Sequence, residues 1–101
     1  MSGKTNRRRG FEYERELVHY FEDKGHDAQR AWGSNGRSLG CAETVDVVAN
    51  GCRIQAKRVK SLSKRLSIPD GADVVIFRED HGKSYVLLHL DDFAEMIKDG
   101  W

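Results

Sequence analysis

The sequence TVDVVANGCRIQAK, residues 44–57, carries the strongest local structural signal in the chain. Asn50-Gly51 lies between two short apolar runs, and an Asn-Gly pair in that position is typical of a β-hairpin with a two-residue turn. Such a turn sets the register, so Asp46 is expected to face Gln55, with β-carbons roughly 5 Å apart. Because side chains alternate along a strand, Lys57 is expected on the same sheet face as Gln55. The hairpin therefore predicts a carboxylate, an amide oxygen and an ammonium group on one patch.

Hydrophobic periodicity and turn residues predict the other elements. A helix is expected from about Gly10 to Lys24, and a last helix is expected to be capped by Asp91 and stopped by Gly100. The remaining elements are a strand over 26–32, a glycine- and serine-rich loop over 33–40, a helical turn over 61–66, a strand over 73–78 buried on both faces and a strand over 84–90. At 101 residues, the chain is large enough for one core. We expect a single α/β domain over residues 10–101, preceded by a flexible basic arm over residues 1–9.

Charge is balanced in number but segregated along the chain. Seventeen Lys and Arg residues face sixteen Asp and Glu residues, for a net charge of +1. Basic residues crowd the N-terminus and the segment after the hairpin, which suggests contacts with a phosphate backbone, although a solvated basic face explains the charge equally well. The residues expected to contact DNA are Arg7, Arg8, Arg9, Arg30, Arg37, Arg58 and Lys60.

Several classes of protein are disfavoured. No apolar stretch has the length of a membrane span, and no signal core follows the basic N-terminus, so we expect a soluble cytoplasmic protein with no membrane partner. Cys41 and Cys52 are expected to be reduced thiols. The four histidines have no metal-ligand spacing, and no Ser-His-Asp or phosphate-loop pattern is present.

Glu14 is the only acid on the apolar stripe of the first predicted helix. It lies near Leu17 and Phe21 on the face expected to meet the sheet. A buried carboxylate needs a base or a metal ion. Two interpretations follow: an ion pair with a residue such as Arg30, or a shared divalent-cation site with Asp46.

The polar groups of this region suit a hard metal ion. Glu14, Asp46, the Gln55 amide oxygen and the Ala56 carbonyl are oxygen ligands of the kind that Mg²⁺ or Mn²⁺ prefers. Such an ion activates water and neutralises charge on a phosphate, while Lys57 can orient the water or stabilise the intermediate. These residues predict phosphodiester hydrolysis.

With these motifs in place, the chain resembles the PD-(D/E)xK nuclease superfamily, and within it the archaeal-type Holliday junction resolvases and their phage relatives. The motifs that carry the resemblance are Gly10 followed by ERELV at 14–18, RAWGS at 30–34, VDVV at 45–48, QAK at 55–57, GADVV at 71–75 and LDDF at 90–93. Their order and spacing cover nearly all of the chain after the basic arm.

The resemblance implies a restriction-endonuclease-like fold, with a central mixed five-stranded sheet flanked by helices. It also implies a homodimer that cuts branched DNA with Mg²⁺ at two symmetric sites, in the host cytoplasm if the protein is phage-encoded. Glu14, Asp46 and Lys57 match the family's helical glutamate, aspartate and lysine, and Ser34 matches a loop serine near the cleavage site. Gln55 stands where the family usually has glutamate, and nearby Glu43 is a candidate compensating carboxylate.

The function expected from the sequence is therefore a metal-dependent, structure-specific DNA endonuclease that resolves four-way junctions by paired symmetric nicks. One alternative is a nuclease for other DNA structures, such as flaps, nicks or plain duplex, because one site serves many substrates. Another is a noncatalytic DNA-binding module in which Gln55 marks a decayed active site. A purely structural protein leaves Glu14 and Asp46 unexplained.

Overall fold

The computed structural model describes residues 3–31 and 36–101. The chain divides into two compact units, Met1–Arg58 with Ile97–Trp101, and Val59–Met96. We describe each unit by itself. The predicted single domain over residues 10–101 stays a prediction.

The first unit begins with helix α1 (Gly3–Asp23). The helix starts at Gly3 rather than near Gly10, so residues 3–9 of the expected arm have a helical backbone. Hydrophobic periodicity did not detect this extension because the added residues are mostly polar and basic, although Lys and Arg have high intrinsic helix propensity. At the other end, Gly25 takes a φ of 85° and its N–H donates to the Glu22 carbonyl at 2.9 Å, which closes the helix.

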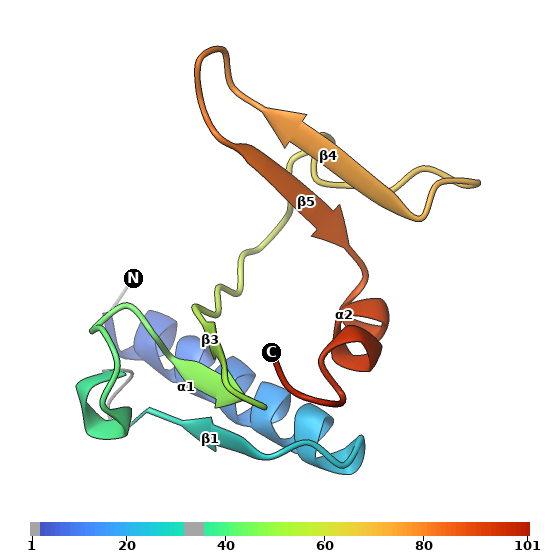
Figure 1. The fold of residues 1–101 in the computed structure, drawn as a ribbon. Helices are drawn as coiled ribbons and strands as arrows, with labels where there is room; N and C mark the ends of the chain where they lie inside the picture. The colour runs from blue at the N-terminus through green and yellow to red at the C-terminus, as the bar shows by residue number, and fades with distance from the viewer. Residues whose placement is uncertain (1–2, 32–35) are drawn as a thin grey trace. The chain divides into compact units, whose positions relative to one another are not determined.

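A three-stranded antiparallel sheet packs against α1 (Figure 1). Its strands are β1 (Ala28–Arg30), β2 (Val47–Ala49) and β3 (Cys52–Ile54), in the order β1-β2-β3. Asn50 and Gly51 have φ of 47° and 85°, which confirms the predicted hairpin turn with two positive-φ residues. The core between helix and sheet includes the buried residues Leu17, Phe21, Ala28, Val47, Ala49 and Cys52.

The second unit contains an antiparallel hairpin and a short helix. Strand β4 (Val74–Arg78) pairs with β5 (Ser84–Leu88), and α2 (Leu90–Met96) follows directly. Asp91 lies inside the first turn of α2 rather than at its cap, because the Phe93 N–H already donates to the His89 carbonyl. A carboxylate in this turn interacts favourably with the helix dipole. One further helical segment, η2 (Gly36–Leu39), belongs to the first unit.

Three expectations about the strands and turns are wrong. The described strands form one sheet of three and one of two, all antiparallel, instead of a mixed five-stranded sheet. Composition marks β-forming segments, but pairing depends on which segments meet, and β4 meets β5 through a short local turn. Val74, Ile76 and Phe77 are exposed, so β4 is not buried on both faces. Residues 61–66 contain only a turn at 64–65, closed by the hydrogen bond from the Leu66 N–H to the Ser63 carbonyl, rather than a helical turn.

Within residues 3–31 and 36–101, neither helix has the length and apolarity that crossing a membrane requires.

Candidate active site

Asp46 lies at a β-bulge that the sequence did not reveal. Val47 is the Cα partner of Ile54, yet the N–H of Asp46 also reaches the Ile54 carbonyl, at 2.8 Å. Asp46 and Val47 thus both lie opposite Ile54, and two residues opposite one form a β-bulge. The predicted pairing of Asp46 with Gln55 is therefore wrong. The Asn-Gly turn sets the register only as far as the bulge, where one extra residue changes it.

The bulge aims the Asp46 carboxylate at the backbone of the neighbouring chain segment. Its Oδ2 accepts a hydrogen bond from the Ala56 N–H at 2.9 Å, and the residue is only 9% exposed. On the other side, the Ala31 N–H donates to the Asp46 carbonyl at 2.8 Å. A carboxylate held by a backbone N–H is charge-assisted and well oriented. Asp46 is consequently a fixed, buried acid between β1 and the end of β3.

Glu14 is buried on α1, as its position on the apolar stripe predicted. The exposed fraction of its side chain is 5%, and Oε1 lies 3.5 Å from Nη1 of Arg30. The guanidinium of Arg30 also lies over the Phe11 ring, 5.2 Å from its centroid. The structure thus shows the ion pair that was one of the two interpretations of Glu14.

Gln55 and Lys57 are exposed, unlike the two acids. Arg30, Val47 and Ile54 are successive Cα partners across the sheet, and Arg30 contacts α1. These partners share the sheet face that meets α1. β3 ends at Ile54, so the alternation of a strand does not fix the sheet face of Gln55 and Lys57. The structure brings Asp46 to Ala56 but does not pair it with Gln55.

The donor set fits a divalent ion by its chemistry rather than by a preformed cluster. No group of three or more His, Cys, Asp and Glu side chains able to hold a metal lies within the described part of the chain. Glu14 and Asp46 are nevertheless buried acids, and buried acids are normally paired or metal-bound. Their oxygens and the Ala56 carbonyl are ligands suited to Mg²⁺ or Mn²⁺.

The other predicted residues have different surroundings or fall outside the description. Ser34 falls outside the described residues. Glu43 forms an exposed ion pair with Arg37, a contact that occupies the candidate compensating carboxylate. Arg58 and Lys60 are exposed, and Arg7, Arg8 and Arg9 lie on the first turns of α1. Their contacts with DNA stay predictions.

Cys41 and Cys52 are both free thiols, and Cys52 is buried. Burial raises the pKa of the Cys52 thiol, while the charge of Arg53 acts in the opposite direction. A buried thiol with a raised pKa is a poor nucleophile. Cys52 is therefore a core residue.

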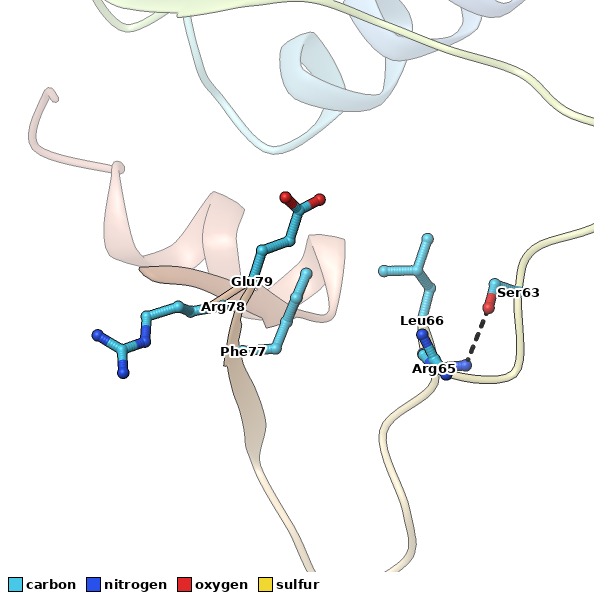
Figure 2. Close-up of a pocket in the computed structure, with 6 residues that line it drawn as sticks. All are labelled: Ser63, Arg65, Leu66, Phe77, Arg78 and Glu79. Atoms are coloured by element: carbon cyan, nitrogen blue, oxygen red, sulfur yellow. Dashed lines mark hydrogen bonds between the residues drawn. The ribbon is translucent and has the colours of Figure 1, made fainter. Parts of the chain in front are cut away.

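A cavity of about 520 Å³ lies in the second unit, and its lining includes none of the predicted site residues. Figure 2 shows Phe77 and Leu66 on its two sides, with the Arg78 side chain pointing away from Leu66. The Arg65 N–H donates to the Ser63 hydroxyl at 3.2 Å and shapes the loop at its edge. The sequence reasoning did not identify this cavity, because its lining comes from a loop and a strand with no motif of their own.

The sequence analysis missed two features of the surroundings of Glu14 and Asp46. Phe11 supports Arg30, a contact that its place one turn before Glu14 makes possible. The bulge had a signal, since Asp is disfavoured within a strand of β-formers.

Comparison with known families supports the nuclease motifs. The sequence model of the family described as archaeal Holliday junction resolvase (Hjc) matches residues 5–65. This segment contains Glu14, Asp46 and the Gln55-Ala56-Lys57 motif. Searches of curated proteins and of solved structures found no match.

Proposed function

This chain belongs to the archaeal Holliday junction resolvase family, and we propose that it is a structure-specific DNA endonuclease that resolves four-way junctions with a divalent metal ion. Mg²⁺ and Mn²⁺ are the ions that its oxygen donors suit best. The substrate is branched DNA, and the reaction is hydrolysis of a phosphodiester bond.

The observation that carries the proposal is that Asp46 is a buried acid held in a β-bulge. Its segment lies within the family match, and the bulge holds its buried carboxylate against the Ala56 N–H. Strand irregularities of this kind are over-represented next to active sites, where they aim a side chain. A merely structural aspartate in a strand would not require this device.

The role proposed for each residue follows from whether it is buried or exposed. Asp46 and Glu14 would hold the ion, with the Ala56 carbonyl as a further ligand. When bound, the ion would lower the pKa of a coordinated water and neutralise charge on the phosphate. Gln55 and Lys57 are exposed, a position that supports contact with incoming DNA. The Lys57 ammonium would bind the scissile phosphate and orient the attacking water.

Resolution of a junction needs two cuts in strands of the same polarity, and one chain has one such acid pair. We propose a homodimer with two symmetric sites, which makes paired nicks. Arg7, Arg8 and Arg9 would bind the phosphates of a junction arm.

The test compares a labelled four-way junction with a linear duplex of the same sequence, in Mg²⁺ or Mn²⁺. Wild-type protein should nick the junction symmetrically. Asp46→Asn keeps an oxygen that can accept from the Ala56 N–H but removes the charge, so it should cut more than about 100-fold more slowly while still binding the junction. The matched control is Asp23→Asn, an exposed residue at the end of α1, which should cut at the wild-type rate.

The possible results separate the competing functions. Equal cutting of junction and duplex would indicate a nuclease for other DNA structures. Salt-sensitive binding without cleavage in either metal would indicate a noncatalytic module with a decayed site. Unchanged cleavage by Asp46→Asn, with its fold verified by circular dichroism, would contradict the proposed active site.

A further inference from the structure

Arg30 is a cation held against the buried acid of α1 by two contacts. Its Nη1 lies 3.5 Å from Glu14 Oε1, and its guanidinium carbon lies 5.2 Å from the Phe11 ring centroid. Phe11 and Glu14 are three residues apart on α1, so they occupy one face of the helix. The aromatic ring and the carboxylate together define the position of the guanidinium.

The same residue adjoins the second acid through the backbone. Arg30 is the Cα partner of Val47, the residue that follows Asp46. The next residue, Ala31, donates its N–H to the Asp46 carbonyl at 2.8 Å. Arg30 therefore lies where the elements that carry Glu14 and Asp46 come together.

The ion pair between Arg30 and Glu14 is longer than a strong contact of this kind. A strong Arg–carboxylate contact has N–O distances of about 2.7–2.9 Å and often two parallel bonds. The Glu14 contact is longer, at 3.5 Å. A divalent ion that bonds a carboxylate directly, at about 2.0–2.1 Å for Mg²⁺, interacts much more strongly with the same oxygen.

We propose that Arg30 is the resident counter-cation of Glu14 in the metal-free protein and that a divalent ion takes its place on the carboxylate. This inference rests on the proposed function, in which Glu14 and Asp46 hold the ion. Arg30 compensates the buried charge before the ion arrives. It therefore competes with the metal and keeps the site in position.

Two measurable effects follow from this competition. Removal of the Arg30 charge leaves Glu14 without this compensation in the absence of metal, so the protein should be less stable. The same change removes the competitor, so the metal should bind more tightly and should restore part of the lost stability. A purely structural arginine would show the first effect without the second.

The experiment measures Mn²⁺ binding without DNA, from the paramagnetic resonance signal of free Mn²⁺, and thermal unfolding with and without Mn²⁺. Arg30→Gln should bind Mn²⁺ about tenfold more tightly than wild type, with a lower melting temperature that rises more steeply with added Mn²⁺. Arg30→Lys, which keeps the charge, should bind close to wild type. The matched control is Arg53→Gln, which removes an exposed arginine from the other sheet face and should leave the affinity nearly unchanged.

A second variant keeps the test valid if Arg30→Gln does not fold. Phe11→Leu retains an apolar side chain and the arginine charge but removes the ring that supports the guanidinium. Because a cation–π contact is worth about 0.5–1 kcal/mol at such a site, Mn²⁺ should bind roughly two- to fivefold more tightly.

The outcomes distinguish this inference from the proposed function. If Mn²⁺ binding depends on Asp46 but Arg30→Gln binds no more tightly than Arg53→Gln, the role of Arg30 is overturned and the metal site stands. If Asp46→Asn binds Mn²⁺ as well as wild type, or wild type binds none, the metal site itself is overturned, and this inference with it.

Discussion

Asn50 connects three parts of the first unit through one side chain and its backbone. Its Oδ1 accepts from the Asp27 N–H at 2.9 Å, and its Nδ2 donates to the Ile97 carbonyl at 2.9 Å. Its carbonyl accepts from the Trp101 N–H at 2.9 Å. The residue that the sequence identifies as a turn former therefore also joins the hairpin to the start of β1 and to the C-terminus.

Asn50→Gly should lower the free energy of unfolding by about 2 kcal/mol, since glycine keeps the positive φ but loses the side-chain hydrogen bonds. Urea unfolding followed by circular dichroism measures the change. Asn50→Asp keeps an acceptor for Asp27 and loses the donor to Ile97, so it should fall between glycine and wild type. Equal stability of Asn50→Gly and wild type would show that these bonds contribute little.

Gln55→Glu should raise Mn²⁺ affinity about tenfold if Gln55 lies close to the ion, because an added carboxylate increases the ligand charge. Gln29→Glu is the matched control, since it adds the same charge at an exposed position on β1. Calorimetric titration measures both. Equal affinities for the two variants would place Gln55 outside the ligand set.

Cys52 should make stability decrease at alkaline pH. Burial raises its pKa in the folded protein, so the folded state retains a proton that the unfolded chain releases. The contribution of Cys52 to the unfolding free energy is fully present below the unfolded thiol pKa of about 8.5. It is lost as the pH rises through the pKa of the folded protein. Compared with Cys52→Ala, wild type should lose more unfolding free energy above that pH, as urea unfolding over a pH series would measure.

At the scale of elements, α1 carries two different groups of residues in one helix. Its first turns carry the basic residues, and its later turns carry the stripe that includes Glu14, Leu17 and Phe21. Gly10 lies between the two parts. A helix that continues through Gly10 links the arginines proposed to bind DNA rigidly to the acid.

Gly10→Ala should stabilise the protein by about 0.5–1 kcal/mol, because alanine has the higher helix propensity and a β-carbon here meets nothing within 4 Å. Gly25→Ala should destabilise it, since Gly25 has a φ of 85°. Thermal melts of the two variants should therefore shift in opposite directions. A loss of stability in Gly10→Ala would show that α1 is not continuous through this residue.

Replacement of Arg7, Arg8 and Arg9 by alanine should weaken junction binding and reduce the slope of log affinity against log salt by about 2–3. Replacement of the same three residues by lysine keeps the charge and should keep the slope. Fluorescence anisotropy over a salt series measures both. An unchanged slope in the alanine variant would exclude these residues as phosphate contacts.

At the scale of the whole molecule, the family match and the structural units do not coincide. The match runs from residue 5 to residue 65, whereas the first unit combines Met1–Arg58 with Ile97–Trp101. All the candidate acids lie within the first unit. The second unit contains the β4–β5 hairpin. Its strand residue Ile76 is 70% exposed, so this apolar side chain is not part of a core.

The proposed homodimer should sediment at twice the monomer mass of 11.5 kDa. With a plasmid that extrudes a cruciform, paired cutting should yield linear DNA. Mixed dimers of wild type and Asp46→Asn should yield mainly nicked circles, because one of their two sites is inactive. Linear product from the mixed dimers in the same proportion as from wild type would contradict two coupled sites.

The sequence alone determined the hairpin turn, the buried stripe of α1 with its single acid, and the motifs of a resolvase. Each depends on a few neighbouring residues, through turn geometry or side-chain periodicity. Only the tertiary structure decided that Asp46 lies in a bulge, that Glu14 meets Arg30, and that β4 and β5 form a separate sheet. These outcomes depend on which distant segments pack together, and the free energy of that packing is not contained in any one stretch of residues.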